Sequence, residues 1–188
     1  MALDAEHLTH IRQHPDRYCP GGPLHLALEV VAYANDEARE MGRVGTCKIT
    51  LRSDGSVIVS DDGRGTDARR TARGQIVRKP VMATRDLRFF NHPDPELLPD
   101  GFPRHGISVV AALSEWLVHT NRRPEGAWSQ RYEHGIPSGP LREVHNDAGQ
   151  GTTVHYLYPA GPLSSQDEAL LRDPSHFPWL VVVLHGPS

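Results

Sequence analysis

A long amphipathic helix is the feature that most constrains how this chain can fold, and the sequence predicts it over residues 24–42. Residues three and four apart lie on one face of a helix, so Glu29, Tyr33 and Asp36 form a polar stripe. A second, apolar side must pack against another layer of the protein. Its members are Leu24, Leu28, Val31, Ala38 and Met41.

A hairpin is predicted directly after this helix. The runs CKITLRS at 47–53 and SVIVSDD at 56–62 are rich in strand-forming residues, and Asp54-Gly55 between them suits a tight hairpin turn. The second run leads into the acidic, glycine-rich turn SDDGRG at 60–65. A carboxylate on the helix beside this turn indicates a small-molecule site, and we expect a nucleotide as the ligand. Taken alone, the same turn would be only a polar turn.

The remaining patterns predict more helices, more strands and one long loop. Residues 84–106 are irregular and rich in proline, and we interpret this loop as a lid. The other helices are expected at 3–14, with Asp4 as its cap, at 66–81, at 107–113 and after Ser164. The other strands are expected at 116–121, 127–133, 151–159 and 179–184. These elements predict an α+β fold, a two-layer sandwich of a mixed, mostly antiparallel sheet with helices on one face.

Composition excludes several classes of function. Lys and Arg number 20 against 23 Asp and Glu, so the formal net charge is -3. Because no basic block stands out, we expect no direct DNA binding. The longest strongly apolar run, at 179–184, is far shorter than the roughly 20 residues that span a bilayer. With two cysteines and no secretory leader, the chain is expected to be cytoplasmic, without membrane contact.

Seven stretches in a fixed order then carry a family resemblance: HIRQHPDRY at 10–18, LALEVV at 26–31, DEA at 36–38, SVIVSDDGRG at 56–65, HGISVVAALSEWL at 105–117, QRYEHGIPSGPL at 130–141 and GTTV at 151–154. In order and spacing they resemble the ATPase domain shared by the B subunits of DNA gyrase and topoisomerase IV, a GHKL (Bergerat-fold) domain. The resemblance covers residues 3–160.

The resemblance implies a role for each matched residue. Glu29 matches the general base that activates water against the γ-phosphate, and Asp61 matches the acceptor for the adenine amino group. The other positions implied to bind the nucleotide, ATP or ADP, are Gly63, Arg64, Gly65 and Thr152 around the base, together with Asp36, Gly101 and Gly106.

The sequence departs from the family pattern where phosphates and metal are bound. Tyr33 stands where the family has the asparagine that coordinates Mg²⁺, and neutral tyrosine is a poor Mg²⁺ ligand. In the lid, Gly101 and Gly106 remain, but Pro103 removes a backbone donor and Arg104 replaces a small residue. Binding of Mg²⁺ is therefore an open question.

Length is the third departure. We expect a nucleotide-binding domain at 1–160 and a short helix and strand extension at 161–188, without the family's transducer domain. Such a chain would be a monomer and would not be a complete topoisomerase. The protein partner is unknown.

Three functions stay open at this point. The first is an adenine-nucleotide-binding domain with weak or lost hydrolysis. The second is a regulatory or protein-interaction module that keeps the fold without turnover, and the third is a slow ATPase linked to DNA topology, with Glu29 as base and Asp36 helping to hold the metal. Gyrase-type inhibitors that occupy the adenine side of the family's pocket could bind here through Asp61 even where ATP does not.

Overall fold

The structure is a computed structural model that describes residues 4–66, 68–70, 76–78, 81–146 and 149–186. Its main sheet has eight strands. They are β1 (Gly45–Leu51), β2 (Val57–Asp61), β5 (Trp116–Arg123), β6 (Gly126–Glu133), β7 (Ile136–Pro137), β8 (Arg142–Val144), β9 (Gly151–Leu157) and β10 (Leu180–His185). The order is β10-β1-β2-β9-β5-β6-β7, with β8 also beside β6. Among the described strand pairs of this sheet, β1 and β10 are parallel and the others are antiparallel, so the sheet is mixed and mostly antiparallel.

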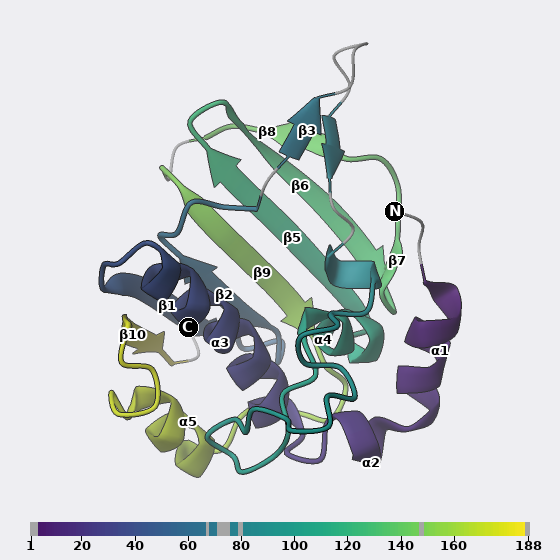
Figure 1. The fold of residues 1–188 in the computed structure, drawn as a ribbon, viewed down its shortest axis with the longest axis vertical. Helices are drawn as coiled ribbons and strands as arrows, with labels where there is room; N and C mark the ends of the chain where they lie inside the picture. Colours follow the sequence, from purple (N-terminus) through teal and green to yellow (C-terminus); the bar gives the residue numbers. More distant parts are fainter. Residues whose placement is uncertain (1–3, 67, 71–75, 79–80, 147–148, 187–188) are drawn as a thin grey trace.

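Helices cover one face of this sheet (Figure 1). The helical elements are α1 (Ala5–Gln13), α2 (Pro15–Tyr18), α3 (Pro23–Glu40), the 3-10 turn η1 (Val81–Ala83), α4 (Ile107–Leu113) and α5 (Ser165–Arg172). Helix α3 packs on β1 and β2, α4 packs between α1 and α3, and α5 packs on β10. The predicted α+β sandwich is therefore confirmed.

The central helix α3 is more deeply enclosed than its amphipathic pattern predicts. In β1, buried and more exposed residues alternate, and Cys47, Ile49 and Leu51 face the core, as expected for a sheet with one covered face. Residues 24–32 of α3, in contrast, are buried all round. The sheet covers one side of the helix, and the loop at 84–106 covers another through contacts with Glu29, Tyr33 and Asp36.

One predicted helix was wrong. Within residues 66–81, the described backbone forms two short strands, β3 (Ala68–Arg70) and β4 (Ile76–Arg78), which pair with each other. Helix propensity in so short a segment is a weak prior, which the pairing of two strands overrides. Cross-strand hydrogen bonds satisfy this backbone instead. The rest of the predicted helix, at 67, 71–75 and 79–80, lies outside the described residues.

The loop at 84–106, called the lid below, is fully described and contains turns and one isolated bridge between Leu97 and Pro103. Its side chains Phe90, Leu98 and Arg104 are buried, so it packs as part of the body. The predicted C-terminal strand is confirmed as β10, which joins the main sheet beside β1. The domain boundary at residue 160 stays a prediction.

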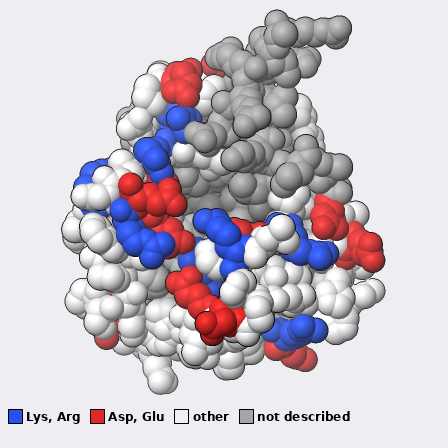
Figure 2. All heavy atoms as spheres, in the orientation of Figure 1, with Lys and Arg blue, Asp and Glu red and all other residues white. Residues whose placement is uncertain are grey.

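Surface charge is mixed on the helical face. In Figure 2, acidic and basic side chains alternate around its centre and do not form a broad area of one sign. No helix in the described ranges has the length and apolar character that crossing a membrane requires.

Candidate functional site

A cavity of about 560 Å³ lies between the C-terminal half of α3, the turn after β2, the strands β5 and β9, and the lid. Five of the residues predicted from the sequence line it, namely Asp36, Asp61, Arg64, Gly65 and Thr152. Its apolar lining includes Val30, Met82, Ile107 and Val154. Glu29, Gly63, Gly101 and Gly106 were also predicted for the site but do not belong to this lining.

Asp61, the last residue of β2, is held rigidly at one end of the cavity. Its Oδ1 atom accepts hydrogen bonds from the backbone N–H groups of Gly63, at 2.9 Å, and Thr152, at 3.2 Å. These two bonds fix the carboxyl plane and leave Oδ2 as the oxygen for a ligand. Burial raises the pKa of Asp61 to about 6, against the opposing effect of both hydrogen bonds.

Glycines make this close arrangement possible. A Cβ atom on Gly151 would overlap the backbone carbonyl oxygen of Asp61, so only glycine lets β9 approach the end of β2. A Cβ atom on Gly65 would lie 2.6 Å from the Oδ1 atom of Asn121, which itself accepts from the backbone N–H of Thr66. Gly151 and Asn121 were not predicted as site residues. Gly151 could have been noticed as a glycine at the start of a strand.

Arg64 lies at the outer edge of the cavity and is held by α3. Its Nε atom donates to Glu37 Oε1 at 2.6 Å, and its Nη2 atom donates to both Glu37 and Glu40 at 3.0 Å. The Arg64 guanidinium lowers the pKa of Glu37. These contacts anchor the turn that follows Asp61 to the central helix.

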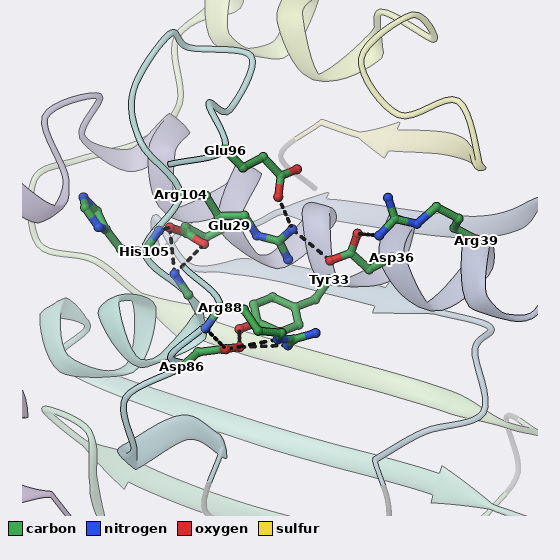
Figure 3. Close-up of polar contacts among 10 residues, drawn as sticks. Glu29, Tyr33, Asp36, Arg39, Asp86, Arg88, Glu96, Arg104 and His105 are labelled. Carbon is green, nitrogen blue, oxygen red and sulfur yellow. Dashed lines mark hydrogen bonds and ion pairs between the residues drawn. The ribbon is translucent and has the colours of Figure 1, made fainter. Parts of the chain in front are cut away.

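Glu29 is fully buried and serves the backbone of the lid. Its carboxylate accepts the backbone N–H groups of His105 and Gly106, the last two residues before α4 (Figure 3). Burial raises the pKa of Glu29, although these bonds oppose the shift. A carboxylate in this position stabilises the end of the lid, and it does not line the cavity.

His25 is a partner of Glu29 that the sequence interpretation missed. Its Nε2 atom lies 3.7 Å from Glu29 Oε1, and its Nδ1 atom lies 2.7 Å from Oδ2 of Asp100 in the lid. The spacing of four residues on one helix could have indicated the His25 and Glu29 pair. Asp100 is 75 residues away from His25, and no local pattern signals that contact.

Tyr33 lines the cavity on the lid side. Its hydroxyl donates to Asp86 Oδ2 at 2.6 Å, and Arg88 donates to both oxygens of the same carboxylate at 3.0 and 2.8 Å (Figure 3). Burial raises the pKa of Tyr33, so its hydroxyl stays neutral. Burial alone would raise the pKa of Asp86, but the hydrogen bonds from Arg88 and Tyr33 lower it.

These residues do not fit a Mg²⁺ ion. A neutral tyrosine that donates its proton offers no ligand charge, and Asp36 is engaged by Arg104 at 2.8 Å and by Arg39 at 3.1 Å. The described part of the chain holds no group of three or more His, Cys, Asp or Glu side chains that could bind a metal.

Arg104 joins the lid to α3. Its side chain is 0% exposed, its Nη1 atom donates to Asp36 at 2.8 Å and to Glu96 at 3.1 Å, and its guanidinium lies 3.8 Å from the ring centre of Phe89. The Arg104 guanidinium also lies 4.8 Å from the ring centre of Tyr33. The sequence interpretation placed Arg104 in the lid but did not predict this ion pair.

The two lid glycines have different surroundings. Gly106 has a φ of 101°, and a Cβ atom there would lie 3.2 Å from both the Tyr33 hydroxyl and Asp86. Its N–H donates to Glu29. Gly101 has a φ of 84°, and a Cβ atom on it would meet no described atom within 4 Å. Gly106 therefore belongs to the contact between the lid and α3, whereas Gly101 serves a turn.

Comparisons with known proteins agree with this architecture. The DNA gyrase B subunit of Thermotoga maritima is 32% identical over 154 residues, and that of Synechocystis is 35% identical over 159 residues. These alignments cover 79% and 81% of this chain but 24% and 15% of the relatives, so the chain spans a quarter or less of their length. No protein-family model matches the chain.

A solved structure shares the fold. The topoisomerase IV ATP-binding domain of Francisella tularensis, determined in complex with a small-molecule inhibitor, matches with a TM-score of 0.64 at 22% identity. The match covers 86% of this chain and 45% of that one. The chain is therefore a homologue of one part of the DNA gyrase B subunit, and its fold is the GHKL fold of a topoisomerase ATP-binding domain.

Proposed function

We propose that this protein binds an adenine nucleotide and hydrolyses it slowly or not at all. The observation that supports adenine recognition best is Asp61, which lines the cavity with one oxygen fixed by two backbone N–H groups. The second oxygen would accept a hydrogen bond from the adenine amino group. Val30, Ile107 and Val154 supply apolar surface for a flat ring, and Thr152 and Gly65 lie at the same end of the cavity.

Slow hydrolysis follows from the position of Glu29. A general base must reach the attacking water, within about 3 Å or through one further water. Glu29 is buried, accepts two lid N–H groups and does not line the cavity. The region around Tyr33 does not fit Mg²⁺ either, because Tyr33 donates its proton to Asp86 and Asp36 is paired with Arg104 and Arg39.

The proposal is tested by calorimetric titration with ADP, with Mg²⁺ and with EDTA, on the wild type and on Asp61→Asn. We expect binding that survives EDTA and is lost in Asp61→Asn, because an amide would present a donor or a weaker acceptor to the amino group. The exposed Asp94→Asn variant is the matched control and should bind like the wild type. Absence of binding in every condition would refute the proposal.

A second candidate function is a regulatory or protein-interaction module that keeps the fold without turnover. It is supported by Tyr33 and Arg88, which line the cavity and both donate to Asp86, and by the pairing of Arg104 with Asp36. A genuine slow ATPase linked to DNA topology would instead require ATP turnover that is lost in Glu29→Ala. A gyrase-type inhibitor that uses Asp61 would bind under any of these functions, and Asp61→Asn should abolish that binding.

A further inference from the structure

We propose that this cavity binds an adenine nucleoside more tightly than the nucleotide with its phosphate chain, because this chain's own groups already engage donors and cations on the lid side. The inference rests on the proposed adenine site and narrows its ligand class. Three sets of contacts and the overall charge of the cavity lining support it.

The first set is the backbone at the end of the lid. A phosphate chain that entered from the adenine end would need donors on the lid side of the cavity. The N–H groups of His105 and Gly106 belong to the lid, and both donate to the Glu29 carboxylate. Both donors are therefore already used within the protein. A ligand phosphate would have to displace a carboxylate that is already buried with its partners.

The second set is Arg104, a cation that a phosphate could otherwise recruit. It is fully buried, paired with Asp36 and Glu96, and stacked on Phe89. Its release would leave Asp36, whose side chain is only 14% exposed, with Arg39 as its ion-pair partner. Breaking a buried pair from one side is strongly unfavourable.

In the third set of contacts, Asp86 neutralises Arg88, a residue that lines the cavity. Its guanidinium donates to both oxygens of Asp86, and Tyr33 donates to the same carboxylate (Figure 3). Asp86 is therefore the anion that this corner already holds. A phosphate group near Arg88 would also lie close to the Asp86 carboxylate, and like charges at short range repel.

The fourth observation is the charge of the whole lining. The described lining has four carboxylates, Asp36, Glu37, Glu40 and Asp61, and three guanidinium groups, Arg64, Arg88 and Arg123. Arg64 pairs with Glu37 and Glu40, Arg88 with Asp86, and Arg123 with Glu125. A polyanion would therefore enter a cavity whose described lining has no excess of positive charge, whereas an uncharged nucleoside would meet no such barrier.

The test compares adenosine, ADP and ATP in calorimetric titrations at neutral pH with EDTA. The wild type should bind adenosine about tenfold or more tightly than ATP, with ADP between them. Asp86→Asn removes one negative charge beside Arg88 and keeps the shape of the side chain. It should tighten ATP binding about fivefold and leave adenosine binding unchanged. Asp94→Asn makes the same charge change at an exposed lid position and should alter neither ligand.

The outcomes separate this inference from the function on which it rests. ATP binding as tight as adenosine binding, with both lost in Asp61→Asn, would overturn the inference and leave the adenine site standing. No binding of any of the three compounds would overturn both. Unchanged ATP affinity in Asp86→Asn would refute the role assigned to Asp86, and unchanged adenosine affinity in that variant shows that it is folded.

Discussion

Replacing Glu29 by alanine should destabilise the fold, because this carboxylate accepts two buried backbone N–H groups. An unsatisfied buried donor costs about 1–3 kcal/mol, so two of them give about 2–6 kcal/mol. Part of this loss of stability is recovered, because alanine has no buried acid group whose desolvation is unfavourable. We therefore expect a loss of about 3 kcal/mol, which lowers the melting temperature by roughly 6–12 °C in a chain of this size.

Urea unfolding followed by circular dichroism measures this change directly. The matched control is Glu40→Ala on the same helix. The Glu40 side chain is 57% exposed, and its replacement should change the free energy of unfolding by less than about 0.5 kcal/mol. A Glu29→Ala variant as stable as Glu40→Ala would refute the reasoning, because it would show that the carboxylate does not support the lid backbone.

The pH dependence of stability tests the raised pKa of Glu29. Because its folded-state pKa is raised above the unfolded value, its contribution to stability is fully present below the unfolded pKa and is lost as pH rises through the folded one. Glu29→Gln cannot titrate, so its stability relative to the wild type should improve over that rise in pH. A constant difference between the two proteins from acid to neutral pH would contradict the raised pKa.

Three further predictions concern the site. Because the pKa of Asp61 is about 6 and its free oxygen would carry the proton, adenosine should bind about tenfold more weakly at about pH 5 than at about pH 7 by titration calorimetry, and a flat profile would contradict this. Gly151→Ala should lower the free energy of unfolding in urea by about 2 kcal/mol or more. Gly149→Ala should lower it by about 1 kcal/mol, because Gly149 also has a positive φ but open space around it. Equal losses would argue against the clash with Asp61. Arg104→Ala should cost about 3 kcal/mol in thermal unfolding, and Arg104→Met should cost less because it keeps packing on Phe89; the reverse order would contradict the packing role.

Local patterns were enough to predict the parts of the fold that depend on local physics. The hairpin of β1 and β2 follows from alternating residues and the Asp54-Gly55 turn, and α1 begins after Asp4, whose side chain accepts from the His7 backbone N–H as a cap does. Residues 66–81 lack such a pattern, and the helix expected there is replaced in the described part by paired strands.

The candidate site also contains residues that could be predicted from the sequence and contacts that could not. Asp61 and Thr152 were placed around one ligand by resemblance, and the structure joins them by a hydrogen bond. The pairing of Arg104 with Asp36 spans 68 residues and depends on how the lid folds back over α3, which no local pattern encodes. Glu29 was assigned from its motif as a base, and its contacts with the lid backbone became visible only in three dimensions.

In the proposed cavity, an adenine site lies beside a phosphate side that the chain's own groups close. The most direct test of this arrangement is a calorimetric titration with adenosine and, separately, with inorganic tripolyphosphate, followed by adenosine titration in the presence of tripolyphosphate. We expect that adenosine binds, that tripolyphosphate gives no binding heat, and that tripolyphosphate does not weaken adenosine binding. Tripolyphosphate that binds by itself while adenosine does not would refute this arrangement of the cavity.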